Sequence, residues 1–227
     1  MTTPYGQNSL NYADAALVLA GGQSRRMGRD KALLTFSREG TDETGGITLL
    51  QQTCKVAQSC AKHTYVLTPW PERYCDLLSS AVVLLKESAV GRGPLIALAQ
   101  GWSMILAHAQ NKHESAPCWL LVLACDMPAL DASTLQTWQG QLKTVREDAI
   151  ALLPRHNNRW EPLCGFYHQR CIPSLETAVQ SNIRSLQQWL DHETVIPLTV
   201  GDSHILQNCN TPMQWQQFLA STEARNP

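Results

Sequence analysis

The sequence predicts a single α/β domain, in which a doubly wound, mostly parallel sheet carries helices on both faces. Short apolar runs alternate along the chain with longer amphipathic runs, which is the order of strands and helices in α/β domains. The apolar runs are near-continuous, which is typical of strands buried on both faces of a parallel sheet. With 227 residues, 44% of them hydrophobic, the chain is long enough to bury such a core.

The candidate elements follow from these runs. Strands are expected at residues 15–20, 64–67, 82–85, 119–123, 150–153 and 163–167, and helices at residues 49–60, 95–108, 133–143, 172–180 and 211–220. Ser133 with Gln136, and Thr211 with Gln214, have the spacing of capping boxes at helix starts. Between two candidate strands, Asn157 and Asn158 predict a turn with unusual backbone angles.

Composition narrows the class of protein. Residues 1–13 are expected to be a flexible extension and residues 14–227 the folded domain, with a surface loop at 37–46. No run approaches the ~20 apolar residues that span a bilayer, and no targeting segment is visible, so we expect a cytoplasmic protein without a membrane partner. A net charge of −1 argues against a nucleic-acid partner. The 8 cysteines lack metal-ligand spacing and are expected to be reduced thiols, most of them in the core.

The first candidate strand leads directly into a segment rich in glycine and positive charge. Glycines stand at positions 21, 22 and 28, and basic residues at 25, 26, 29 and 31. Glycines let the backbone approach a ligand closely, and arginine and lysine bind phosphate oxygens. The spacing matches neither G-x-x-x-x-G-K-[ST] nor G-x-G-x-x-G, which disfavours a P-loop NTPase and a dinucleotide-dependent dehydrogenase. A phosphate-binding loop is therefore predicted; the alternative is a glycine-rich turn with solvated arginines.

A second candidate site follows the apolar run 119–123, where the chain continues into Asp126. A carboxylate at the carboxyl end of a parallel strand lies at the edge where α/β sheets bind ligands. Mg²⁺ binds few protein carboxylates and takes its other oxygens from water and substrate phosphates. Asp126 is therefore the predicted metal ligand; the alternative is an aspartate that only caps a loop.

The segment L-A-G-G-x-x-R-R-M-G-x-D-K, residues 19–31, resembles the signature loop of the molybdenum cofactor guanylyltransferases. The resemblance implies that Leu19, Ala20, Gly21 and Gly22 line the nucleotide and that Lys31 contacts phosphate. Arg25 matches the first arginine of the motif, which implies that it holds the triphosphate with Lys31.

Other segments follow the same family order. Gly93-Pro94-Leu95 matches a G-P-L element, and Glu87 is the nearest match to an aspartate that contacts the nucleotide in that family. Asn208 and Asn210 match an N-x-N-T-P motif and are expected to bind the pterin; the alternative is that they belong only to the cap of the last helix. The metal motif departs from the family pattern, because Ala124 replaces proline and Met127 replaces threonine, and Asp-Met-Pro is closer to the related cytidylyltransferases.

The resemblance covers nearly the whole chain and implies a Mg²⁺-dependent nucleotidyltransferase. Its expected substrates are GTP and a molybdenum-bearing pterin phosphate, and its products a pterin–guanine dinucleotide and pyrophosphate. Asp126, Lys31 and Arg25 are the expected catalytic residues. Other molybdenum cofactor maturation proteins and apo-molybdoenzymes are the expected protein partners. Two alternatives stay open, a cytidylyltransferase acting on the same pterin and a non-catalytic nucleotide-binding relative.

Overall fold

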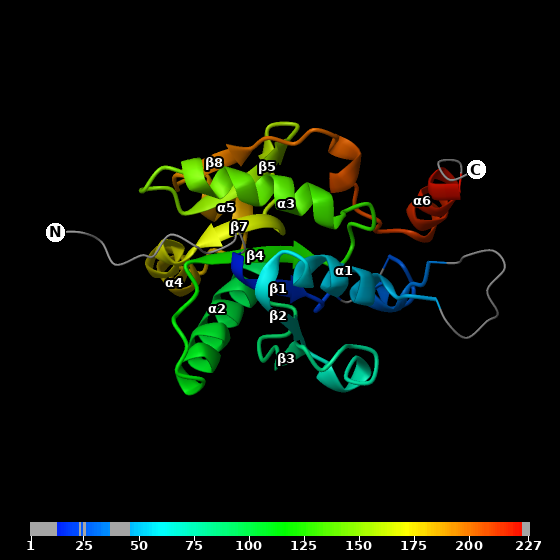
Figure 1. Cartoon of the computed structure of the whole chain (residues 1–227), viewed down its shortest axis with the longest axis horizontal. Coiled ribbons are helices and arrows are strands. Elements are labelled where there is room, and N and C mark those ends of the chain that lie inside the picture. The colour runs from blue at the N-terminus through cyan, green and yellow to red at the C-terminus, as the bar shows by residue number, and fades with distance from the viewer. Residues whose placement is uncertain (1–12, 23, 25, 37–45, 224–227) are drawn as a thin grey trace.

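The computed structural model describes residues 13–22, 24, 26–36 and 46–223. It contains the predicted α/β fold (Figure 1). The strands are β1 (Ala13–Leu19), β2 (Ala61–Thr68), β3 (Val82–Lys86), β4 (Trp119–Ala124), β5 (Ala151–His156), β6 (Arg159–Trp160), β7 (Cys164–His168) and β8 (Val195–Leu198). The α-helices are α1 (Leu49–Gln58), α2 (Pro94–Asn111), α3 (Ala132–Gly140), α4 (Ile172–Gln180), α5 (Leu186–Leu190) and α6 (Pro212–Glu223). Short 3-10 turns include η1 (Lys31–Leu33) and η2 (Pro71–Arg73).

All of the strands belong to an 8-stranded sheet with the order β3-β2-β1-β4-β7-β5-β6, to which β8 adds by pairing with β5. The pairs β1–β2, β1–β4, β2–β3 and β5–β8 are parallel, whereas β7 runs antiparallel to both β4 and β5. The carboxyl ends of β1 and β4 are adjacent, because Leu19 pairs with Ala124. The two predicted site segments therefore begin side by side, at the edge where α/β sheets bind ligands.

Helices cover both faces of this sheet, as Figure 1 shows. Successive residues of β1 point to opposite faces, so Ala16 and Val18 pack in the core that contains α1 and α3. Leu17 packs in the second core, which contains α2, α4 and α5. Both faces of β1 are therefore buried, which explains its near-continuous apolar sequence.

Several elements differ from the sequence-based expectation. The predicted capping box at Ser133 is wrong: α3 begins at Ala132, and the Asp131 carboxylate accepts the backbone N–H of Thr134 at 2.8 Å. An aspartate two residues earlier competes for the same role and leaves Ser133 within the first turn. The strands β6 and β8 and the short helix α5 were not predicted, since each has five residues or fewer and too little periodicity.

Other local expectations are confirmed. Gln214 and Thr211 exchange the two hydrogen bonds of a capping box, at 3.3 and 3.1 Å, and α6 begins at Pro212. Asn157 and Asn158 have positive φ angles of 48° and 62°. The described cysteines are free thiols, buried except for Cys75 and the half-buried Cys118.

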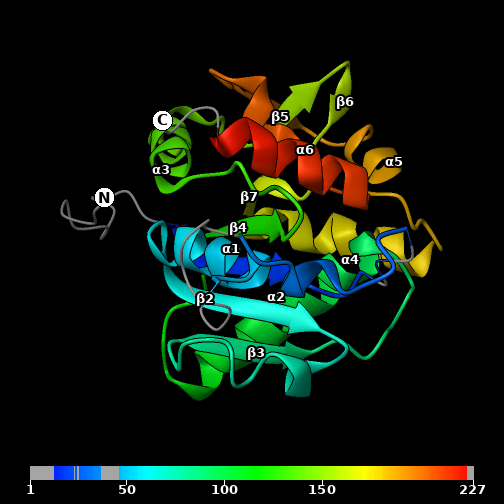
Figure 2. The same ribbon diagram turned by 90° about the vertical axis from the view of Figure 1, so that its right-hand side faces the viewer.

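The last helix packs against the segment that follows β1. Trp215 of α6 lies in a small buried cluster with Met27, Leu34, Leu49 and Cys209. Figure 2 shows α6 on the same side of the molecule as α1. Of the predicted extension, only Ala13 is described, and it pairs with Ala61 of β2. Within the described part of the chain, no helix is both long and apolar enough to cross a membrane.

Candidate active site

The loop after β1 folds around Ser24. The carbonyl oxygen of Ser24 accepts the N–H groups of Met27 at 2.9 Å and Gly28 at 3.2 Å. Its hydroxyl accepts the backbone N–H of Lys31 at 3.1 Å. Ser24 and Gly28 have positive φ angles of 45° and 71°, a region that glycine enters at little steric cost. These hydrogen bonds stabilise a compact loop and position Lys31 at the carboxyl end of the sheet.

The ammonium group of Lys31 joins two oxygens from distant parts of the chain. Its Nζ donates to Oδ2 of Asp126 at 2.9 Å and to Oδ1 of Asn210 at 2.9 Å. The Lys31 and Asp126 side chains are 15% and 18% exposed, so this ion pair is largely shielded from water. The predicted phosphate, metal and pterin residues therefore meet at one nitrogen atom.

The backbone explains how the C-terminal segment reaches this point. Asp126 follows β4, and its carbonyl oxygen accepts the N–H of Cys209 at 2.8 Å. The Cys209 side chain is buried in the cluster beneath α6. On either side of it, Asn210 reaches Lys31, whereas the half-buried Asn208 side chain makes no hydrogen bond to another described residue.

Glu87 lies directly after β3 and is buried, with 7% of its surface exposed. Its N–H donates to the carbonyl oxygen of Thr68 at 2.8 Å, which continues the pairing of β3 with β2. Burial raises the pKa of the Glu87 carboxyl, because a charged group loses hydration there. A Cβ atom added to Gly21 would overlap Oε2 of Glu87 and would lie 3.3 Å from Cδ of Pro69. Gly21 and Glu87 are therefore in direct contact.

The other predicted nucleotide residues follow β1 closely. The Ala20 side chain is buried in the core, so only its backbone is available to a ligand. Leu19 is half-buried and packs against the core on the α2 face. Gly22 is exposed, and a Cβ atom added there would meet no atom within 4 Å in the part of the chain that the structure describes. Arg25, the predicted triphosphate contact, lies outside the described residues.

A metal ion would find few ligands here. Among the described residues, no group of three or more His, Cys, Asp and Glu side chains is placed to hold one. Asp126 offers a carboxylate and Asn210 an amide oxygen, the kind of ligand that Mg²⁺ prefers. Burial raises the pKa of the Glu161 carboxyl; among the neighbouring charges, His156 lowers this pKa and Asp126 raises it.

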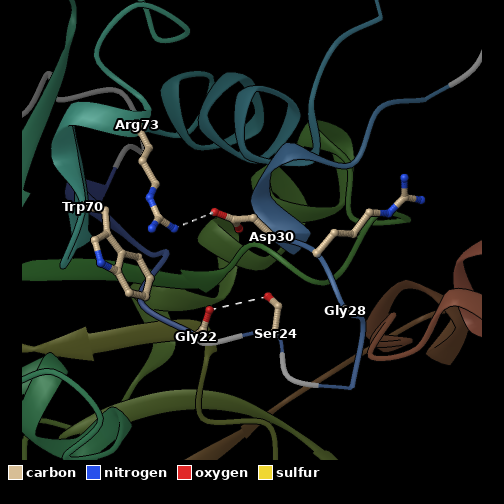
Figure 3. A pocket seen from close by; sticks show the side chains of 7 residues that line it. Gly22, Ser24, Gly28, Asp30, Trp70 and Arg73 are labelled. Carbon is tan, nitrogen blue, oxygen red and sulfur yellow. Dashed lines mark hydrogen bonds and ion pairs between the residues drawn. The ribbon is translucent and has the colours of Figure 1, made fainter.

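Sequence reasoning assigned no role to several residues at this site. Ser24 organises the loop, and Trp70 and Arg73, from the segment after β2, form one wall of a pocket beside the loop (Figure 3). Trp70 and Arg73 follow a parallel strand, and this position could have indicated a role, because the carboxyl ends of parallel strands lie at the ligand-binding edge of the sheet. Glu161 precedes β7, whose antiparallel direction brings it back towards Asp126, and nothing in the sequence indicated that direction.

Comparisons with known proteins identify the family of the chain. A family model described as a MobA-like NTP transferase domain matches residues 16–195. The chain is 48% identical to a probable molybdenum cofactor guanylyltransferase of Nostoc sp. over 197 residues, covering 87% of this chain and 86% of the relative. It is 39% identical to a protein of the same name from Synechococcus elongatus, covering 91% of this chain and 98% of the relative.

A solved structure shares the fold. The molybdopterin-guanine dinucleotide biosynthesis protein A of Archaeoglobus fulgidus superposes with a TM-score of 0.67 at 20% identity, covering 92% of this chain and 99% of that one. The family match includes the loop after β1, Glu87 and Asp126, and ends before Asn208 and Asn210. From this match and from the identity to its relatives, the chain belongs to the MobA-like NTP transferase family.

Proposed function

We propose that this protein is a molybdenum cofactor guanylyltransferase, which transfers GMP from GTP to the phosphate of a molybdenum-bearing pterin. The observation that carries this proposal is the meeting of Lys31, Asp126 and Asn210 beside the loop after β1. The 48% identity to the Nostoc relative of that name supports the choice of reaction.

The reaction needs positioning and charge stabilisation more than covalent help. A phosphate oxygen of the pterin attacks the α-phosphorus of GTP, and the bond to the β-phosphate oxygen breaks. The bonding electron pair leaves with pyrophosphate. The attacking phosphate is already ionised at neutral pH, so no general base is required. The Lys31 ammonium, which Asp126 and Asn210 hold in place, stabilises negative charge on the phosphates.

Mg²⁺ dependence belongs to this proposal. Asp126 would hold the ion, because one carboxylate together with substrate phosphates and water is a usual Mg²⁺ environment. Only Oδ2 of Asp126 contacts Lys31, so the carboxylate has a second oxygen to offer. When bound, the ion would neutralise charge on the phosphate oxygens.

Guanine is the proposed base because of Gly21 and Glu87. The Watson–Crick edge of guanine presents adjacent N–H donors, which a carboxylate accepts together, whereas cytosine does not present this pair. Glu87 is the acidic residue beside the nucleotide segment, and Gly21 leaves room for its carboxylate. Met127, which made the metal motif resemble that of cytidylyltransferases, is buried in the core and does not face a ligand.

The test is a pyrophosphate-release assay with purified protein, Mg²⁺ and molybdenum-bearing pterin phosphate, in which GTP and CTP are compared. Mass spectrometry of the product identifies the dinucleotide. We expect pyrophosphate release and a guanine dinucleotide with GTP, and little product with CTP. Faster turnover with CTP would favour the cytidylyltransferase, and nucleotide binding without turnover would favour the non-catalytic relative. The proposed protein partners, maturation proteins and apo-molybdoenzymes, would receive the product.

A further inference from the structure

A pocket of about 250 Å³ lies between the loop after β1 and η2 (Figure 3). It is lined by Gly22, Ser24, Gly28, Arg29, Asp30, Trp70 and Arg73. Pockets for whole drug-sized ligands begin at about 300 Å³. This space therefore suits a part of a nucleotide rather than all of it.

On the loop side of the pocket, the backbone of two glycines is exposed. A Cβ atom added to Gly22 or to Gly28 would meet no atom of the described residues within 4 Å. Side-chain packing therefore does not require glycine at either position, whereas the φ of 71° favours glycine at position 28. A glycine that borders open space lets a ligand approach the backbone N–H groups, which is how proteins bind phosphate.

The opposite wall presents a positioned cation. The guanidinium carbon of Arg73 lies 4.4 Å from the ring centre of Trp70, a cation–π distance that holds the side chain in place. Figure 3 shows Arg73 reaching from η2 towards Asp30. Arg73 and Asp30 form an ion pair, with 3.8 Å between Nη1 and Oδ2, which is too long for a hydrogen bond, and 49% of the Arg73 side chain is exposed.

The Asp30 carboxylate accepts hydrogen bonds from residues other than Arg73. Its Oδ2 accepts the Tyr74 hydroxyl at 2.7 Å, and its Oδ1 accepts the N–H of Ala32 at 3.0 Å. Arg73 therefore keeps N–H donors for another partner, and these donors match the geometry of phosphate oxygens.

We propose that Arg73, held over Trp70, binds the β- and γ-phosphates of the nucleoside triphosphate and retains this contact as pyrophosphate leaves. Arg73 approaches the phosphates from the η2 side of the loop, and Lys31 approaches them from the β4 side. Phosphates suit the pocket better than a base does, because its lining offers the donors of Arg73 and the backbone of Gly22 and Gly28, and Trp70 already packs against Arg73. This inference rests on the proposed function only in requiring a nucleoside triphosphate.

The test compares the binding of GTP, pyrophosphate and GMP to the full-length protein with Mg²⁺, by calorimetry, in the wild type and Arg73→Gln. Losing a charged hydrogen bond costs about 1.5–3 kcal/mol, so GTP and pyrophosphate should bind about tenfold more weakly or worse. GMP lacks the β- and γ-phosphates, so its affinity should not change. Arg73→Lys should bind GTP with intermediate affinity, because it keeps the charge and loses the fork of donors.

Arg146→Gln is the matched control, because Arg146 is an exposed arginine paired with Asp148 outside the pocket lining. It should leave all three affinities unchanged. Equal weakening of GTP and GMP by Arg73→Gln, or no weakening of either, would overturn the inference. The contact is independent of the base. Arg73→Gln should therefore weaken the binding of CTP and leave the binding of CMP unchanged. A protein that proves to be a cytidylyltransferase would refute the proposed base and leave this inference standing.

Discussion

The Cα atom of Gly21 faces the carboxylate of Glu87 so closely that a Cβ atom at position 21 would overlap Oε2 of Glu87. Gly21 and Glu87 come from different parts of the chain and meet because β1 and β3 both flank β2. A glycine here therefore has a packing reason, whereas Gly22 next to it borders open space. Gly21 and Gly22 therefore differ in their surroundings: the first is packed against Glu87, and the second is exposed.

Gly21→Ala should consequently push Glu87 aside. We expect the free energy of unfolding to fall by about 1 kcal/mol, the lower end of the cost of overpacking, because the overlapped atom ends a flexible side chain; urea denaturation measures this fall. The GTP-induced rise in melting temperature should shrink relative to the rise induced by CTP, because the displaced carboxylate no longer meets guanine. Gly22→Ala is the control for stability and should unfold close to wild type. Equal losses of stability in both variants would contradict the packing difference.

Replacing Glu87 by glutamine should raise the stability of the fold at neutral pH and weaken the binding of GTP. Burial raises the pKa of Glu87, so between its ordinary and its raised pKa the folded state binds more protons than the unfolded state. The stability that this group contributes is present below the ordinary pKa and is lost as the pH rises through the raised pKa. Glu87→Gln removes that loss, so it should be more stable than wild type at neutral pH, and this advantage should shrink at pH 4.5.

Urea denaturation at both pH values measures this difference in the free energy of unfolding. The same variant should bind GTP more weakly, since an amide cannot accept both guanine donors. A gain in stability of the same size at both pH values would mean that the charge of Glu87 is not its cause. Unchanged GTP affinity would remove Glu87 from the base site.

Asp126→Ala should abolish turnover and leave the fold intact. Metal ions contribute several kcal/mol to transition-state stabilisation, so we expect at least about a hundredfold loss of kcat. Lys31 keeps its hydrogen bond to Asn210 in this variant, and the backbone bond from Cys209 to residue 126 does not involve the side chain. Steady-state kinetics beside a thermal melt gives both readings, and Asp148→Ala, at an exposed aspartate, is the control. Near-normal turnover in the folded variant would remove Asp126 from the metal site.

The sequence predicted the parts of this molecule that depend on local pattern. Apolar runs placed β1, β2, β3, β4, β5 and β7, because strands buried on both faces leave long apolar stretches. The direction of β7 was not predictable, because the length of a connection does not settle whether the returning strand runs parallel or antiparallel. The strands β6 and β8 are short. The pairing of β8 with β5 depends on a tertiary contact, whereas β6 pairs with β5 across the predicted turn at Asn157 and Asn158.

In the candidate site, too, features of local sequence pattern were predictable and features of tertiary contact were not. The motif placed Lys31 in the loop after one strand and Asp126 just after another, and parallel strands bring their carboxyl ends to one edge of the sheet. The contact of Lys31 with Asn210 could not be predicted, because it depends on the hydrogen bond between Cys209 and Asp126 across the fold. The stacking of Arg73 on Trp70 depends on a turn, η2, that carries no periodic signal.

The paired asparagines yield the last prediction, because the structure gives them different surroundings. The Asn210 side chain accepts from Lys31, and only its backbone N–H, which donates to Gln214 at 2.8 Å, takes part in the cap of α6. Asn210→Ala should therefore loosen Lys31 without disturbing the helix, and we expect the KM for GTP to rise by roughly five- to tenfold, as for the loss of one hydrogen bond. Asn208 bonds to no other described side chain, so Asn208→Ala should raise the KM for the pterin phosphate and leave the KM for GTP unchanged. Initial rates with each substrate varied in turn resolve the two effects, and thermal melts confirm that both variants fold. If both variants raise the same KM, the pair acts as one unit, and the separate assignment of Asn210 to Lys31 and Asn208 to the pterin is wrong.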